Sequence, residues 1–110
     1  MNESETIEEE VYHFGETTFC YNNNELRTRS SRVLITSRQA DILRLLAKNI
    51  GNVVGKEMIQ EAVWGTVSYA NSLAVNVQMT YLRHALQHDA TVKIESLKKK
   101  GYVLTLLSEV

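Results

Sequence analysis

Residues of the types that carry acid–base, nucleophilic or metal chemistry are few among the 110 residues of this chain. There are three histidines, His13, His84 and His88, and one cysteine, Cys20. His84 and His88 are four positions apart, a spacing that on a helix can hold a metal ion. No further acid or thiol ligand at a suitable spacing accompanies them, and there is no glycine-rich phosphate loop or nucleophile elbow. We therefore expect that the chain is not an enzyme and has no metal site and no cofactor.

A different chemistry is indicated by the segment from Asn71 to Gln87, which is predicted to be a helix with two distinct faces. One face is an apolar stripe at helical spacing, formed by Val75, Met79, Leu82 and Leu86. The opposite face carries no acidic side chain and consists of Leu73, Asn76, Val77, Thr80, Arg83 and His84, with Tyr81 at its edge. Its aliphatic residues suit thymine methyl groups, and its polar residues suit base edges or phosphates. The same face also suits contact with another protein, so these residues alone leave both interpretations open.

Three consecutive lysines, Lys98, Lys99 and Lys100, lie between two predicted strands, Val92 to Leu97 and Tyr102 to Leu106. Closed by Gly101, they form the turn of a predicted β-hairpin, with the ring of Tyr102 expected to pack under it. A run of charges is more often a solvated loop, but a cationic turn also suits a phosphate backbone or a narrow minor groove. Together with the helix face described above, the hairpin favours DNA as the partner.

The elements that must position these residues can be read from the change in hydrophobic period along the chain. Between Val11 and Ile35, short apolar or β-branched runs alternate with turn-forming residues, which predicts three or four antiparallel strands. Thr36 and Gln39 have the spacing of a capping box, so a helix is expected to begin there and to end near Gly51.

Two further short elements precede the third helix. Val53 and Val54 are predicted to form a brief strand, and a second helix is expected from Lys56 to about Trp64. Its predicted core face consists of Met58, Ile59, Ala62 and Val63. The order of elements predicts an α+β winged helix-turn-helix, with an N-terminal antiparallel β-sheet, a three-helix core and a C-terminal β-hairpin wing.

Composition is that of one ordinary globular domain, and no apolar run is long enough to span a membrane. The formal net charge is −1, but five glutamates and no basic residue lie within residues 1–10. The other hundred residues hold 12 basic and 8 acidic groups, a net charge of +4. We interpret residues 1–10 as an acidic flexible tail or linker and residues 11–110 as the domain.

Five motifs in order resemble the OmpR/PhoB-type winged-helix DNA-binding domain over roughly Val11 to Leu106. They are Ile35-Thr36-x-x-Gln39-x-x-Ile42-Leu43, Gly51-Asn52-Val53-Val54-x-Lys56-Glu57-x-Ile59, Val63-Trp64-Gly65, Val75-x-Val77-x-Met79-x-x-Leu82-Arg83-x-x-Leu86 and Gly101-Tyr102. The resemblance implies the effector domain of a bacterial transcription regulator that binds double-stranded DNA. The third helix would enter the major groove, and the wing would touch the adjacent minor groove.

The same resemblance implies RNA polymerase as a partner through the loop from Gly65 to Ala70, and a tandem dimer on DNA. Relatives commonly carry arginine at the positions of Leu73, Thr80 and Tyr81, so base readout here is expected to rely more on apolar contact. The basic wing tip resembles the ToxR-like branch, whereas the Trp64-Gly65 spacing resembles the response-regulator branch. Both branches stay open.

The alternative class is a winged helix that serves as a protein–protein interaction module through Leu73, Val77 and Tyr81. Salt dependence distinguishes the two classes, because binding through lysines weakens steeply with salt and apolar docking does not. The single cysteine and the acidic N-terminus predict a cytoplasmic location, or the cytoplasmic part of a membrane-anchored regulator.

Overall fold

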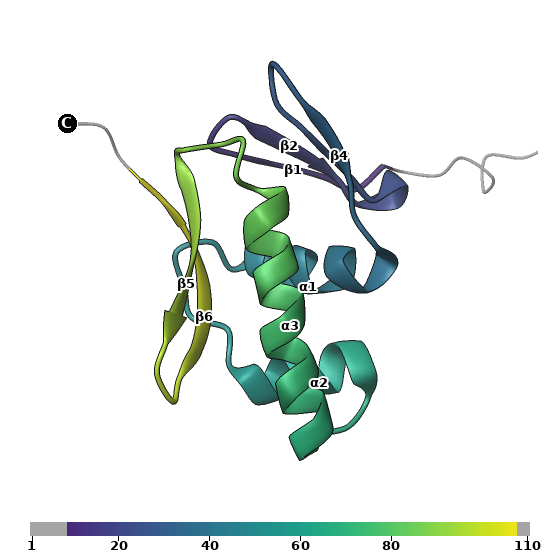
Figure 1. The fold of residues 1–110 in the computed structure, drawn as a ribbon, viewed down its shortest axis with the longest axis vertical. Coiled ribbons are helices and arrows are strands. Elements are labelled where there is room, and N and C mark those ends of the chain that lie inside the picture. The colour runs from purple at the N-terminus through teal and green to yellow at the C-terminus, as the bar shows by residue number, and fades with distance from the viewer. Residues whose placement is uncertain (1–8, 108–110) are drawn as a thin grey trace, which may run out of the picture.

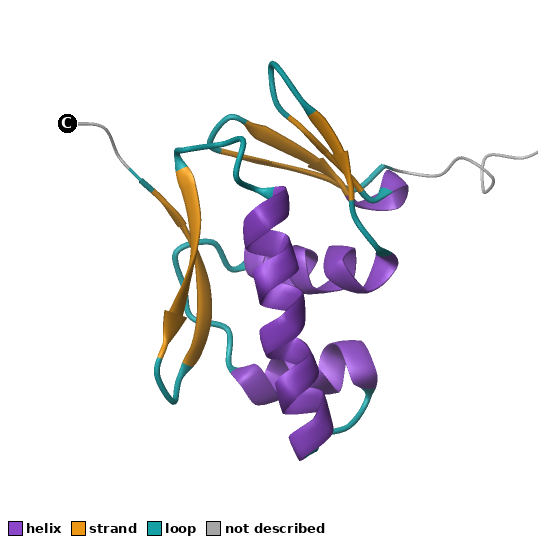
Figure 2. Ribbon diagram, viewed as in Figure 1, coloured by secondary structure: helices purple, strands orange, loops and turns teal. Residues whose placement is uncertain are grey.

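The computed structural model describes residues 9–107, whose elements follow the predicted order (Figure 1). Most of the predicted acidic tail, residues 1–8, lies outside the described part of the chain, as do residues 108–110. Figure 2 shows an N-terminal sheet at one end, three helices beneath it and a hairpin along their side. This arrangement confirms the predicted winged helix-turn-helix architecture.

Four antiparallel strands form the N-terminal sheet in the order β1-β2-β3-β4. Their bounds are β1 (Val11–Phe14), β2 (Thr17–Cys20), β3 (Glu25–Arg27) and β4 (Arg32–Leu34), with a single 3-10 turn at Tyr21–Asn23 between β2 and β3. The register aligns Tyr12, Phe19, Leu26 and Val33 across the sheet. Phe19 and Leu26 are buried, so this row of the sheet joins the core that is shared with the helices.

Helix α1 (Ser37–Lys48) begins at the predicted capping box. The Gln39 amide donates to Thr36 Oγ1 at 3.1 Å, and the Thr36 amide donates to Gln39 Oε1 at 3.0 Å. These two bonds satisfy backbone donors that would otherwise have no partner in the first turn. The helix then buries Ile42, Leu43 and Leu46 against the other elements.

Helix α2 (Lys56–Trp64) has the predicted length but a different buried face. Met58 is 55% exposed and Ala62 is exposed, so the prediction of both as core residues was wrong. Ile59 and the polar Gln60 are buried instead. Gln60 is tolerated there because its Oε1 accepts a hydrogen bond from the Ser68 backbone, which fastens the following loop to the helix.

Helix α3 (Tyr69–Ala85) begins two residues earlier and ends two residues earlier than predicted. Ser68 is its N-cap and accepts from the Asn71 amide at 3.0 Å, so the loop predicted to reach Ala70 comprises only residues 65–68. His88 falls beyond the helix end and therefore does not share a helix with His84. The predicted core stripe is confirmed, because all four of its members are buried: Val75, Met79, Leu82 and Leu86.

The wing consists of β5 (Val92–Leu97) and β6 (Gly101–Leu106). Val54 pairs with Tyr102 through two backbone hydrogen bonds of 2.8 and 3.0 Å, but this is an isolated bridge and Val53 lies outside it, so the brief strand predicted at Val53 and Val54 is reduced to one residue. Buried Asp89 holds the start of the wing to the first hairpin by accepting from the Glu16 amide and from Thr17 Oγ1. Burial by itself would raise the pKa of Asp89, but hydrogen bonds from Thr91, Thr17 and Glu16 outweigh it and lower the pKa.

Candidate nucleic-acid interface

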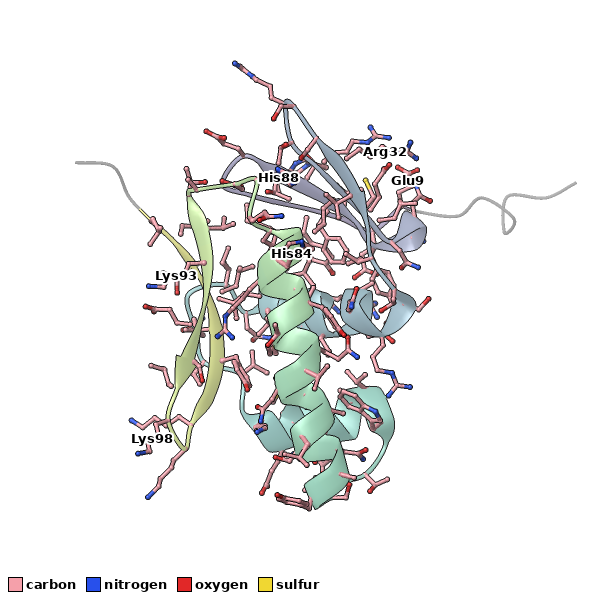
Figure 3. The ribbon with its side chains drawn as sticks, viewed as in Figure 1. Glu9, Arg32, His84, His88, Lys93 and Lys98 are labelled. Carbon is pink, nitrogen blue, oxygen red and sulfur yellow. The ribbon has the colours of Figure 1, made fainter. Side chains whose placement is uncertain are left out.

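Asn76, a member of the predicted α3 face, lines the same groove as the lysines of the wing turn. In Figure 1, the N-terminal half of α3 and the β5–β6 turn both point away from the N-terminal sheet. Figure 3 shows Lys98 at the wing tip, and His88 at the far end of the molecule beyond the end of α3. An extended partner could therefore contact the helix and the wing tip together without touching the sheet.

Large apolar side chains are exposed along α3. Leu73 is 46% exposed, Val77 50% and Tyr81 55%. These three side chains recur every four residues, so they lie along one face of the helix. The predicted division of α3 into a buried stripe and an exposed face is thus present in the structure.

Two polar residues of the same face, Asn76 and Arg83, already form hydrogen bonds within the protein, which the sequence did not indicate. Asn76 Oδ1 accepts from Lys56 Nζ at 2.9 Å and from Tyr102 Oη at 2.7 Å. Arg83 donates from Nε to the backbone oxygen of Ile94 at 3.0 Å. Both side chains therefore tie α3 to neighbouring elements as well as lying beside the exposed face.

Thr80 and His84 complete the predicted set on α3, and both are exposed. The Thr80 hydroxyl donates to the Asn76 backbone oxygen at 3.2 Å, one turn earlier in the helix. That bond leaves the lone pairs of its oxygen available as acceptors. His84 lies in the last turn of the helix, and its Nε2 is 3.4 Å from the side-chain Nε2 of Gln87.

Tyr102 anchors the wing beneath its turn, as predicted. It is 6% exposed, and the guanidinium carbon of Arg83 lies 6.0 Å from its ring centroid. Burial raises the pKa of the Tyr102 phenol, while the nearby Arg83 charge opposes this effect. The phenol therefore remains protonated at neutral pH and donates a hydrogen bond to Asn76 Oδ1.

Backbone geometry shapes the wing tip itself. Lys99 adopts a φ of +65° and Gly101 a φ of +144°. A Cβ on Gly101 would lie 2.1 Å from the Val54 carbonyl oxygen, so this position accepts only glycine. The tight approach holds the three lysines at the end of the hairpin, where all three are exposed.

A groove of about 570 Å³ separates the wing from the helices. It is lined by the start of α2, one side of α3 and the wing turn. Four of its lining residues are lysines, Lys56, Lys98, Lys99 and Lys100, and Glu57 is the one acidic residue among them. None of the ion pairs found within residues 9–107 involves these four lysines. The groove is therefore electropositive.

Lys56 is the one residue of this set that the sequence did not indicate as a contact. Lys56 belongs to one of the motifs on which the family resemblance rests. A single lysine at the start of a helix, however, has no sequence pattern that marks it as a DNA contact rather than an ordinary surface residue. Its position beside Asn76 and the wing turn depends on how α2 packs against α3.

Within residues 9–107, no group of three or more His, Cys, Asp or Glu side chains is placed to hold a metal ion. No helix in that part of the chain combines the length and apolar composition needed to cross a bilayer.

Comparison with known proteins identifies this arrangement. A family described as "Transcriptional regulatory protein, C terminal" matches residues 30–104, which is more than half of the chain. This chain belongs to that family. It is an OmpR/PhoB-type winged-helix DNA-binding domain of the kind found in bacterial transcription regulators.

Relatives of this OmpR/PhoB-type domain include the response regulator ArlR of Staphylococcus aureus. The two are 32% identical over 81 residues, which cover 73% of this chain and 37% of ArlR. The chain spans less than half the length of the curated relatives it matches.

Solved structures agree on the fold. The DNA-binding domain of Escherichia coli CadC superposes with a TM-score of 0.77 at 24% identity, covering 87% of this chain and 92% of that one. The DNA-binding domain of Klebsiella pneumoniae RstA, solved in complex with the RstA box, gives a TM-score of 0.75 at 22% identity. That alignment covers 87% of this chain and 97% of the RstA domain.

Proposed function

We propose that this domain binds double-stranded DNA sequence-specifically as the effector part of a bacterial transcription regulator. In this proposal the exposed face of α3 occupies the major groove, and the Lys98–Lys100 turn lies on the adjacent backbone or minor groove. The observation that carries it is the groove lined by four lysines, which lies between Asn76 of the predicted α3 face and the wing turn. An electropositive groove next to an exposed helix suits a duplex, whose backbone is a dense line of negative charge.

The chemistry of the face suggests how the work is divided. Val77, Leu73 and Tyr81 offer apolar surface suited to thymine methyl groups. The wing lysines offer charge, which supplies affinity without sequence information. Base discrimination would therefore come from α3, and most of the salt-dependent affinity from the wing.

Selection of bound duplexes from random DNA, followed by footprinting, tests the proposal. A recurring sequence motif protected over one major groove and the neighbouring minor groove is the expected result. Recovery of no motif, or protection without any sequence preference, would refute sequence-specific binding.

The alternative function is a protein–protein interaction module, which the exposed Leu73, Val77 and Tyr81 favour. Affinity for DNA should fall steeply between low and moderate salt if lysines neutralise phosphates. A partner protein docked on the apolar face would bind with little salt dependence, and DNA would then bind weakly or not at all.

Two further partners belong to this proposal. A tandem pair of domains on adjacent half-sites would raise the affinity of each, and the free domain should be a monomer. Sedimentation should show a species of 12.5 kDa without DNA and two domains per duplex with it. RNA polymerase is proposed to contact residues 65–68 and the adjoining Tyr69, whose side chain is 80% exposed.

A further inference from the structure

Asn76 is the meeting point of three elements, and its hydrogen bonds restrict what it can do. Its Oδ1 accepts from Lys56 Nζ on α2 at 2.9 Å and from Tyr102 Oη on β6 at 2.7 Å. An ammonium group can only donate, so the Lys56 contact requires the amide oxygen to face it. An amide oxygen has two lone pairs, and both are occupied here.

This geometry conflicts with a role for Asn76 in reading adenine. An asparagine recognises adenine in the major groove by donating to N7 and accepting from the N6 amino group. The accepting half of that pattern needs Oδ1. To provide it, Asn76 would have to give up Lys56 or Tyr102, leaving a donor without its partner.

Lys56, in contrast, retains binding capacity. One of its three N–H groups is directed at Asn76, and two remain. The residue lines the same groove as the three wing lysines. A cation held at a fixed point in an electropositive groove is suited to a phosphate oxygen.

We propose that Asn76 is a positioning residue and that Lys56 is an additional phosphate-binding residue of this interface. Asn76 holds the Lys56 ammonium in the groove and, through Tyr102, fixes the wing relative to α3. Neither residue reads sequence. This inference rests on the proposed function, namely that the domain binds DNA.

Asn76→Asp distinguishes positioning from base reading. Aspartate can accept from Lys56 and Tyr102 as asparagine does, but it has no N–H to donate to a base or phosphate. We expect Asn76→Asp to keep both internal hydrogen bonds and to lower affinity for selected and scrambled duplexes by the same factor, because its added negative charge repels every phosphate backbone alike. A loss of affinity confined to the selected duplex, with binding to a scrambled duplex unchanged, would show that Asn76 donates to a base and would overturn the proposal.

Asn76→Ala removes both bonds and should weaken binding to selected and scrambled duplexes by the same factor, between about two- and tenfold. A loss confined to the selected duplex would show base reading and refute the inference. Thermal melting of each variant, measured without DNA, separates a loss of contacts from a loss of folded protein.

Lys56→Met tests the phosphate contact directly. It should reduce the magnitude of the negative slope of log affinity against log salt by about 0.9, the effect of one phosphate contact. Lys56→Arg should restore the wild-type slope. In the Lys56→Met background, Asn76→Ala should cost less than it does in the wild type, because part of its effect passes through the missing ammonium. An unchanged slope, or fully additive losses, would overturn the role of Lys56. Failure of the wild type to bind any duplex would instead refute the proposed function itself.

Discussion

Neutralising the wing tip should change the salt dependence of DNA binding more than any other surface substitution. Lys98, Lys99 and Lys100 are exposed, line one groove and take part in none of the ion pairs within residues 9–107. Glutamine is the suitable replacement at all three positions, because it keeps much of the chain length and removes the charge. It also leaves unchanged the steric demand at Lys99, whose φ is +65°.

The magnitude follows from counterion release. Each phosphate contact contributes about 0.9 to the slope of log affinity against log salt, so three contacts contribute about 2.7. Between about 50 and 200 mM salt, a slope of that size corresponds to a change in affinity of about 40-fold. Over this salt range the affinity of the wild type for DNA should therefore fall about 40-fold more than the affinity of the triple variant.

Fluorescence anisotropy with a labelled duplex, titrated at four or five salt concentrations, measures both slopes. Lys93→Gln is the matched control, because Lys93 lies on β5 away from the wing tip and pairs with Glu95 at 3.4 Å (Figure 3). It should leave the slope unchanged. An equal slope for the wild type and the triple variant would remove the wing from the interface and contradict the reasoning.

The remaining predictions concern α3 and the support of the wing. Val77→Ala should change the free energy of unfolding by no more than ~0.5 kcal/mol, because the side chain is half exposed, yet lower discrimination between selected and scrambled DNA by about 1–3 kcal/mol. Leu82→Ala, at a fully buried position of the same helix, should cost about 2–5 kcal/mol of stability in urea denaturation. Early melting of Val77→Ala, or full discrimination by it, would show that the recognition face is assigned incorrectly. Asp89 has a pKa below its ordinary value of 3.8, so its stabilising effect is present above that pH and is lost as the pH falls through the lowered value. Asp89→Ala should therefore reduce stability by about 1–3 kcal/mol at pH 7, with the gap to the wild type narrowing below pH ~4. A gap that stays constant from pH 7 to pH ~3 would show that the carboxylate charge is not the stabilising feature.

The sequence by itself was sufficient for the order of elements and for most of their bounds. Hydrophobic period, the Thr36 capping box and the turn residues are local signals, and they act on the backbone within a few positions. The core stripe of α3 could also be predicted, because a helix of about five turns repeats its apolar pattern often enough to show which face is buried. The motifs distributed along the chain were also sufficient for the family.

The buried face of the shorter helix α2 could not be predicted in the same way. On α2 the predicted core residue Met58 is exposed, whereas Gln60 is buried. Two and a half turns give too few repeats to fix the phase when a polar residue takes a core position. Gln60 is stable there only because Ser68 supplies a hydrogen-bond donor across the following loop.

The residues of the candidate interface were likewise predicted only in part from the sequence. The wing lysines and the exposed α3 face were evident from residue types and spacing. The engagement of Asn76 with Lys56 and Tyr102 was not, because these partners lie 20 and 26 positions away along the chain. Whether a polar side chain is available to DNA depends on which neighbours tertiary packing brings within hydrogen-bond distance, and helix phase contains no information about them. The packing of α2 and the wing against α3 thus decided which of the predicted contact residues are engaged in hydrogen bonds between elements and which are not.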